Sequence, residues 1–97
     1  MIIISQDKKE IINFNNIKNI KLDPVMDYKH IIVNVGDSSY ITIAGYETEI
    51  RAKEVLQEIE KTYIENKIIE MYSHLGDVRE PNRRNYALTP AYEMPIN

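Results

Sequence analysis

Arginine is concentrated in one short segment late in the chain, where Arg79, Arg83 and Arg84 are three of the four arginines present. His74 precedes this group and Tyr86 follows it. A planar guanidinium pairs with phosphate or carboxylate through parallel hydrogen bonds, and a neighbouring aromatic ring can stack on a base or anchor a protein interface. The segment therefore predicts a partner-binding site. A solvated loop, partly neutralised by nearby acidic residues, is the alternative interpretation.

The other polar clusters favour turns over catalysis. The run Asp7-Lys8-Lys9-Glu10 is typical of a charged turn, and Asp37-Ser38-Ser39 lacks both a nearby histidine and the glycines of a nucleophile elbow. Neither His30 nor His74 has a second ligand at a metal-binding spacing. We therefore predict a protein that is not an enzyme and that has no cofactor and no metal site.

Composition narrows the partners and the compartment. The chain has 97 residues, which is the size of one domain, and it contains no cysteine, so disulfides and thiolate sites are excluded. The apolar run at residues 1–4 is too short for a signal peptide or a membrane span. A net charge of -3 disfavours nucleic acid as a partner. We expect a cytoplasmic protein that does not contact a membrane.

The first half of the chain predicts strands. Short apolar runs at residues 2–4, 11–14 and 17–22 are separated by polar turns and by Asp23-Pro24. Residues 30–35 and 40–46 alternate apolar and polar side chains around Gly36-Asp37-Ser38-Ser39, which predicts a hairpin with Ile31, Val33 and Val35 on one face. Residues 1–46 therefore form a β-meander in this interpretation.

The spacing of apolar residues along the sequence changes at Glu47. Apolar residues then recur at three- and four-residue steps from Thr48, the expected N-cap, to about Asn66, which predicts one amphipathic helix over residues 47–66. Residues 67–75 fit a helix or a strand, and residues 67–97 form an irregular tail with a final strand at 91–94 as a further option. The predicted fold class is α+β, with a four- to five-stranded antiparallel sheet packed by one long helix.

An ordered set of short segments carries a family resemblance. The segments are Ile4-Ser5-Gln6-Asp7, Ile12-Asn13-Phe14-Asn15-Asn16-Ile17, Gly45-Tyr46-Glu47-Thr48-Glu49 with Ala52-Lys53-Glu54-Val55-Leu56, and Tyr92-Glu93-Met94-Pro95. Over residues 2–65 and the last few, the chain resembles short proteins encoded by phages, prophages and integrative elements of low-GC Gram-positive bacteria. The resemblance implies an accessory protein whose longer 68–91 segment, on a constant scaffold, contacts the partner.

The sequence and the resemblance are consistent with three functions. The first is a non-enzymatic protein that binds and inhibits a host protein, with a defence component as the expected target and the arginine segment as the contact surface. The second is an oligomeric sponge in which the arginines hold a phosphorylated signalling nucleotide. The third is a minor virion component, which would be found in purified particles.

Self-association is a separate prediction. We expect the hairpin face opposite the helix to carry Ile32, Tyr40, Thr42 and Tyr46, which would leave apolar surface exposed in a monomer. A homodimer formed through this face, or through a free sheet edge, would cover that surface.

Overall fold

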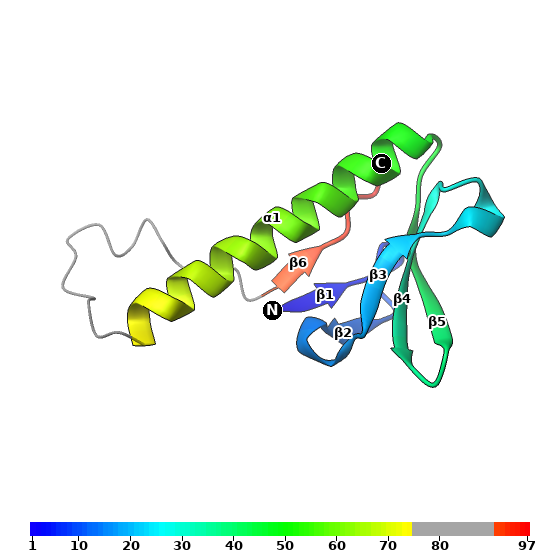
Figure 1. The fold of residues 1–97 in the computed structure, drawn as a ribbon. Coiled ribbons are helices and arrows are strands. Elements are labelled where there is room, and N and C mark those ends of the chain that lie inside the picture. The colour runs from blue at the N-terminus through cyan, green and yellow to red at the C-terminus, as the bar shows by residue number, and fades with distance from the viewer. Residues whose placement is uncertain (75–90) are drawn as a thin grey trace.

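The computed structural model describes residues 1–74 and 91–97, with side chains described for residues 1–71 and 91–97 (Figure 1). Its elements, in chain order, are β1 (Ile2–Ile4), β2 (Ile11–Asn13), the 3-10 turn η1 (Phe14–Asn16), β3 (Asn19–Leu22), the 3-10 turn η2 (Pro24–Met26), β4 (His30–Gly36), β5 (Ser39–Gly45), α1 (Glu49–His74) and β6 (Ala91–Glu93). The α+β class is confirmed, and a strand does form at residues 91–93.

The strands form two sheets, so the prediction of a single antiparallel sheet is wrong. One sheet has the order β2-β1-β6 and the other has the order β3-β4-β5. Within the first sheet β2 is antiparallel to β1, whereas β6 runs parallel to it, with Ile3 opposite Tyr92. A parallel neighbour needs a long crossover connection, and here α1 lies within that connection. Local sequence patterns do not reveal such a pairing between distant segments.

Gln6 joins the two sheets where β1 ends. Its backbone N–H donates to the carbonyl of Ile43 in β5 over 2.8 Å. Its side-chain amide exchanges hydrogen bonds with the backbone of Gly45, with Nε2 donating to the carbonyl over 3.0 Å and Oε1 accepting from the N–H over 2.9 Å. The amide therefore continues the hydrogen-bonding pattern of a strand across the gap between the sheets.

The predicted hairpin is confirmed, with a tighter turn and irregular faces. Asp37 and Ser38 form a two-residue connection and both have positive φ, 49° and 61°, the conformation of a type I′ turn. Pairing shifts register between Ile31 and Ile32 and again between Asn34 and Gly36. The second irregularity turns Val35 outward, so that it is 42% exposed and does not share the buried face with Ile31.

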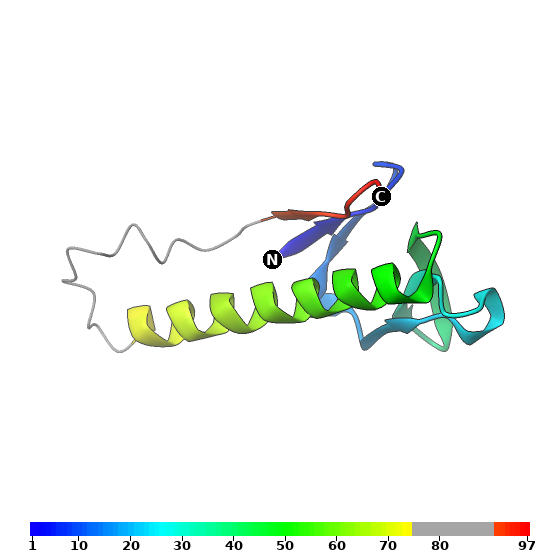
Figure 2. The ribbon, with the colours of Figure 1, turned by 90° about the horizontal axis from the view of Figure 1, so that it is seen from above.

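The helix is longer than the periodicity predicts, because α1 continues to His74 instead of ending near Asn66. Thr48 caps it, with its side-chain Oγ1 accepting from the backbone N–H of Arg51 over 3.1 Å. Figure 2 shows α1 running alongside β1 and β6, with the β3-β4-β5 sheet near its N-terminal end. One core draws on both sheets and the helix; its buried members are Ile3, Ile12, Ile31, Val33, Ile43, Ala44, Tyr46, Ala52, Val55, Ile59, Tyr92 and Met94.

Candidate functional site

An apolar tip projects from the connection between β3 and β4, which we call the 24–29 loop. Val25 is 85% exposed, Met26 is 47% exposed and Tyr28 is 46% exposed. The loop lies beside the N-terminal end of α1 in both ribbon views (Figures 1 and 2). Single exposed apolar residues are ordinary on protein surfaces, but three within one six-residue loop make the loop a candidate contact surface.

Asp23 holds the backbone of this loop in place. Its carboxylate Oδ1 accepts from the N–H of Val25 over 3.0 Å, and its carbonyl accepts from the N–H of Met26 and of Tyr28 over 3.2 and 2.8 Å. Pro24 fixes its own φ at the start of the turn. The exposed apolar side chains therefore lie on a backbone that hydrogen bonds hold in one conformation.

Two residues of the loop have left-handed backbones. Asp27 has φ of 55° and Tyr28 has φ of 60°. This conformation costs free energy in residues other than glycine, and here the surrounding bonds retain it. The backbone carbonyl of Lys29, at the end of the loop, accepts from the N–H of Tyr46 over 2.9 Å, which links the loop to the residues before α1. A pre-ordered apolar tip loses little conformational entropy on binding, which favours a role as an interface anchor.

A second feature is a cavity of about 790 Å³ between the end of β1, the start of α1 and the last residues of the chain. Polar residues in its lining include Gln6, Asp7, His30, Thr48 and Arg51. The ring of His30 packs on Gly45, where an added Cβ would lie 2.7 Å from the ring Nε2. Nδ1 of His30 is buried without a hydrogen-bond partner among the described residues, so packing against Gly45 positions this ring.

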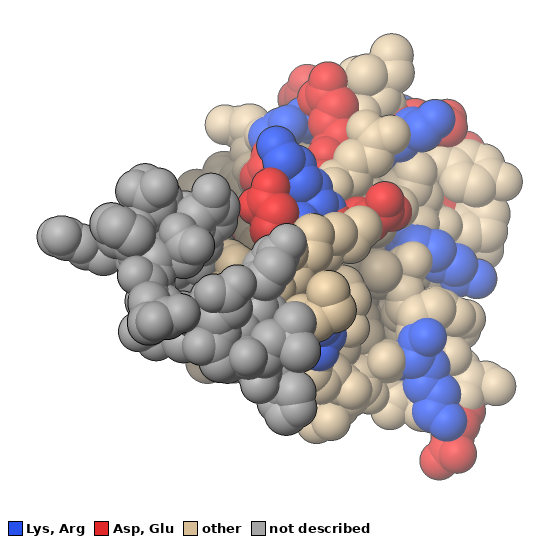
Figure 3. Space-filling view, turned by 60° about the vertical axis from the view of Figure 1, so that its left-hand side comes forward, with Lys and Arg blue, Asp and Glu red and all other residues tan. Residues whose placement is uncertain are grey.

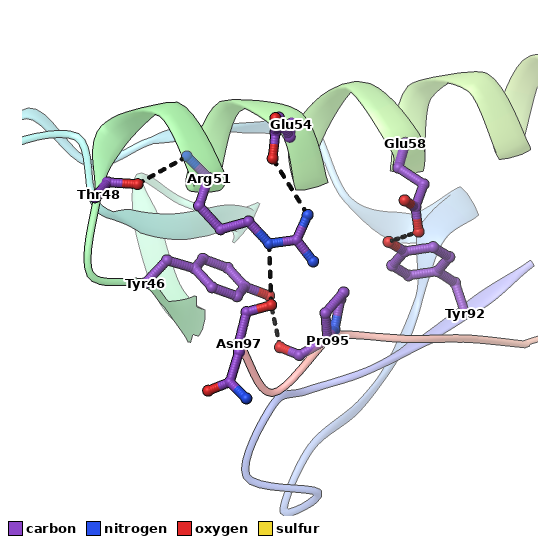
Figure 4. A network of polar contacts seen from close by, with 8 residues as sticks. All are labelled: Tyr46, Thr48, Arg51, Glu54, Glu58, Tyr92, Pro95 and Asn97. Atoms are coloured by element: carbon purple, nitrogen blue, oxygen red, sulfur yellow. Dashed lines mark hydrogen bonds and ion pairs between the residues drawn. The ribbon is translucent and has the colours of Figure 1, made fainter.

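Arg51, a cationic side chain in this lining, already makes contacts with other groups of the protein. Arg51 donates from Nε to the main-chain oxygen of Asn97 over 2.9 Å and pairs with Glu54 over 3.4 Å (Figure 4). Asp7 and Glu47 line the same cavity. The Ser5 hydroxyl and then the Lys9 N–H donate to Asp7 and lower the pKa of its carboxyl. Two carboxyl groups and a committed guanidinium do not favour a phosphate ligand in this cavity.

Two tyrosines fasten residues 92–97 to the rest of the fold, and one of them, Tyr46, lines this cavity. Tyr92 donates from its hydroxyl to Glu58 over 2.6 Å, and Tyr46 donates to the carbonyl of Pro95 over 2.8 Å (Figure 4). Burial, followed by the bond to Glu58, raises the pKa of Tyr92, and burial likewise raises the pKa of Tyr46. These hydroxyls stay protonated and serve as structural donors at neutral pH.

The predicted arginine site lies largely outside the described residues. Arg79, Arg83, Arg84 and Tyr86 fall in the segment 75–90, and His74 is the last residue of α1, with its side chain outside the description. Their role in partner binding stays a prediction.

The predicted dimer face is only partly where it was expected. Ile32, Tyr40 and Thr42 lie on one face of the second sheet, but Ile32 is 7% exposed because Lys21 and Thr42 flank it across the strands. Tyr46 is 8% exposed and belongs to the core. The expected exposure of these two residues is therefore wrong.

Tyr40 is 42% exposed, and Lys21 Nζ lies 4.8 Å from the centre of its ring. Hydrogen bonds, first from Asn19, lower the pKa of Tyr40. An interface there stays a prediction.

Sequence reasoning missed the 24–29 loop. It used Asp23-Pro24 as a stop signal for a strand and gave no role to the apolar pair that follows. The available signal was Val25-Met26 inside a turn, where no strand or helix face could bury both side chains.

The described residues offer neither a metal site nor a membrane span. Within residues 1–74 and 91–97, no group of three or more histidine, aspartate and glutamate side chains could hold a metal ion. The described part of the chain also contains no helix with both the length and the apolar character needed to cross a bilayer. Figure 3 shows acidic and basic side chains next to one another on the face in view, without a broad area of either sign among the described residues.

Comparisons with protein-family models, with curated proteins and with solved structures found no match to this chain. The function proposed below therefore depends on the geometry of the molecule and on the resemblance described above.

Proposed function

We propose that this chain is a non-enzymatic binding protein of the phage and mobile-element type that it resembles, and that it acts by docking on a host protein and blocking it. The observation that carries the proposal is the 24–29 loop, which presents Val25, Met26 and Tyr28 to solvent on a hydrogen-bonded backbone. The complementary surface on the target is an apolar groove. A bacterial defence component in the host cytoplasm is the expected class of target.

The loop has the properties of an interface anchor. Interface energy concentrates in a few well-packed apolar and aromatic side chains, and surrounding contacts mainly exclude water. When Val25 and Met26 are buried in a partner, each Å² of apolar surface removed from water contributes about 25 cal/mol of favourable free energy. Because the backbone is already ordered, less of that free energy is lost in fixing the loop.

The arginines at 79, 83 and 84 provide a second contact in this proposal. They would pair with carboxylates of the host protein around the apolar anchor, where Arg forms bidentate contacts. Sequestration of a phosphorylated nucleotide by the same arginines is the alternative, in which the 24–29 loop has no role.

An affinity experiment with matched variants distinguishes these functions. The tagged protein is used to capture partners from a low-GC Gram-positive lysate, beside Val25→Ser with Met26→Ser, and beside Ala at 79, 83 and 84. Ile11→Ser is the control, because Ile11 is also strongly exposed, at 70%, but lies on β2. We expect a stoichiometric host protein that is retained by the control and lost with the loop variant.

The other outcomes decide against the proposal. A host protein that binds the loop variant as well as it binds the unchanged protein shows that the loop is not the anchor. Absence of any protein, together with a phosphate-containing compound that absorbs at about 260 nm after denaturation and is lost with the arginine variant, supports nucleotide sequestration instead.

A further inference from the structure

The second half of α1 carries an apolar stripe on the side away from the core. Ile64 is 49% exposed, Ile68 is 44% exposed and Met71 is 60% exposed. Steps of four and three residues place these side chains on one face of a helix. We call them the 64–71 stripe. The core residues Ala52, Val55 and Ile59 lie on the opposite face of the same helix.

Charged residues flank the stripe on both sides in an ordered way. At about 100° per residue, Lys61 and Glu65 lie on one flank of Ile64, whereas Glu60 and Lys67 lie on the other. All four are exposed. Each flank therefore has one acid and one base, placed on opposite sides of Ile64 along the helix axis.

We propose that the 64–71 stripe binds a second copy of this chain, with the two α1 helices antiparallel and the two-fold axis passing at Ile64. Such an axis leaves each flank facing the same flank of the other copy and reverses the direction along the helix. Lys61 then faces Glu65 of the second copy with an offset of two residues, about 3 Å. Glu60 faces Lys67 of the second copy with an offset of one residue, about 1.5 Å.

The apolar residues fit the same arrangement. Ile64 meets its own counterpart at the axis, as a self-complementary interface requires. Ile68 and Met71 of each copy then lie along the aliphatic stems of Gln57 and Lys61 of the other, which cover apolar surface while keeping their polar ends in water. The four interhelical charge pairs specify the antiparallel register more than they add affinity.

The contacts that these charges already make do not prevent this pairing. Lys67 Nζ lies 3.4 Å from Glu70, and the two side chains are 48% and 50% exposed. An exposed pair of this kind contributes little, so Lys67 can turn toward a second copy at small cost. This association is independent of the proposed function, because it uses none of the residues of the 24–29 loop or of the arginine segment.

The first test is the oligomeric state of the whole chain. Sedimentation equilibrium from micromolar to submillimolar protein is expected to show a reversible monomer–dimer equilibrium. Ile64→Glu places two carboxylates at the axis and is expected to leave only monomer. Ile50→Glu is the control, since Ile50 is 73% exposed on the first turn of the same helix and lies outside the paired region. It is expected to dimerise as the unchanged protein does.

Charge reversal provides the sharper test. Lys61→Glu sets two acidic residues against each other at both ends of the interface, and we expect the dissociation constant to rise about tenfold. Glu65→Lys is expected to weaken the dimer similarly, because it opposes two lysines. The double variant restores opposite charges and is expected to recover the original dissociation constant. Loss of helix stability alone would not give this recovery.

Several results would overturn the proposal. One is a protein that stays monomeric over the whole concentration range. A dimer unaffected by Ile64→Glu places the interface elsewhere, and its loss with Tyr40→Ala would assign it to the second sheet. A double charge reversal that dimerises no better than the single variants rejects the antiparallel register.

Discussion

The two halves of α1 differ in what covers them, although one uninterrupted helix forms both. The first half buries Ala52, Val55 and Ile59 against the two sheets. Among residues 60–71, whose side chains are described, Asn66 is the one buried side chain, and Ile64 and Met71 are about half exposed or more. Apolar residues at similar spacing thus pack a core on one face of the first half and leave a free surface on the opposite face of the second half.

The difference follows from where the sheets lie relative to the helix. The β3-β4-β5 sheet lies near the N-terminal end of α1, and the tail residues 92–97 fasten to that half through Glu58 and Arg51 (Figures 2 and 4). The stability of the first half therefore depends on tertiary contacts. We expect the second half to tolerate substitutions that would unfold the first.

The largest expected effect separates the halves with one substitution in each. Ile59 is 1% exposed, so Ile59→Ala removes buried methyl groups, leaves a cavity and should lower the free energy of unfolding by about 3 kcal/mol. Ile64→Ala should change it by less than about 0.5 kcal/mol in the monomer. Urea unfolding at low protein concentration measures both. Equal losses would show that the second half is packed as tightly as the first.

Gln6 gives the next largest effect, because it links the sheets to the tail that fastens the first half. Its Nε2 donates to the carbonyl of Pro95 over 3.1 Å and to that of Ile96 over 2.8 Å, besides its bonds to Gly45. Gln6→Met keeps the side-chain size but removes these bonds, and we expect a loss of about 2 kcal/mol. Hydrogen exchange should then rise in residues 49–59 more than in 60–74. A uniform rise would contradict the assigned role.

Prediction from sequence succeeded where the determinant is local. The hairpin with Asp37-Ser38, the cap at Thr48 and the helix itself follow from turn residues and periodicity within short windows. The helix end was placed too early because the apolar residues in 67–74 fit the spacing of a helix and that of a strand, and no local signal distinguishes the two. The faces of β4 were wrong beyond Asn34 because a bulge reverses the alternation of side chains.

The division into two sheets could not be predicted in the same way. The pairing of β6 with β1 joins residues about ninety apart, and a three-residue run such as 91–93 carries no information about its partner. Ile64 lies on the helix face opposite Ala52, Val55 and Ile59, so its outward position follows from the helical period, whereas the position of the sheets depends on strand pairing that the helix sequence does not contain. The loop at 24–29 was readable in principle, since its apolar pair lies within a turn.

A pH titration tests how much the hydrogen bond from Tyr92 to Glu58 stabilises the first half of α1. The folded state raises the pKa of this phenol above its ordinary value of 10.0, first by burial and then through the bond to Glu58. The folded protein therefore holds the proton more tightly than the unfolded chain, so this stabilisation is fully present below about pH 10 and is lost as the pH rises beyond it. Tyr92→Phe should cost about 1 kcal/mol at neutral pH.

The same variant checks the sign of the pH dependence. Urea unfolding from about pH 8 to pH 11 should show a decline at the upper end that is shallower in Tyr92→Phe than in the unchanged protein. Burial also raises the pKa of Tyr46, so its ionisation should lower the free energy of unfolding at high pH in both proteins. Parallel curves would mean that Tyr92 ionises no differently in the folded and unfolded states.

The smallest expected effects come from two basic residues that make similar contacts in the two halves. Arg51 pairs with Glu54, and Lys67 pairs with Glu70, each over 3.4 Å and three residues apart. Each cation also lies near a tyrosine ring, with Arg51 Cζ 5.9 Å from the centre of the Tyr46 ring and Lys67 Nζ 5.3 Å from that of Tyr63. Arg51 alone of the two also donates to the main-chain oxygen of Asn97.

That one additional bond sets the expected difference. Arg51→Ala should lower the free energy of unfolding by about 1 kcal/mol, and Lys67→Ala by less than about 0.5 kcal/mol. Added salt screens both ion pairs, so it should remove most of the Lys67 effect and leave the part of the Arg51 effect that comes from Asn97. Both are measured in the Ile64→Glu background, where association does not contribute. Equal effects that salt abolishes alike would mean that fastening the tail adds nothing to the first half of α1.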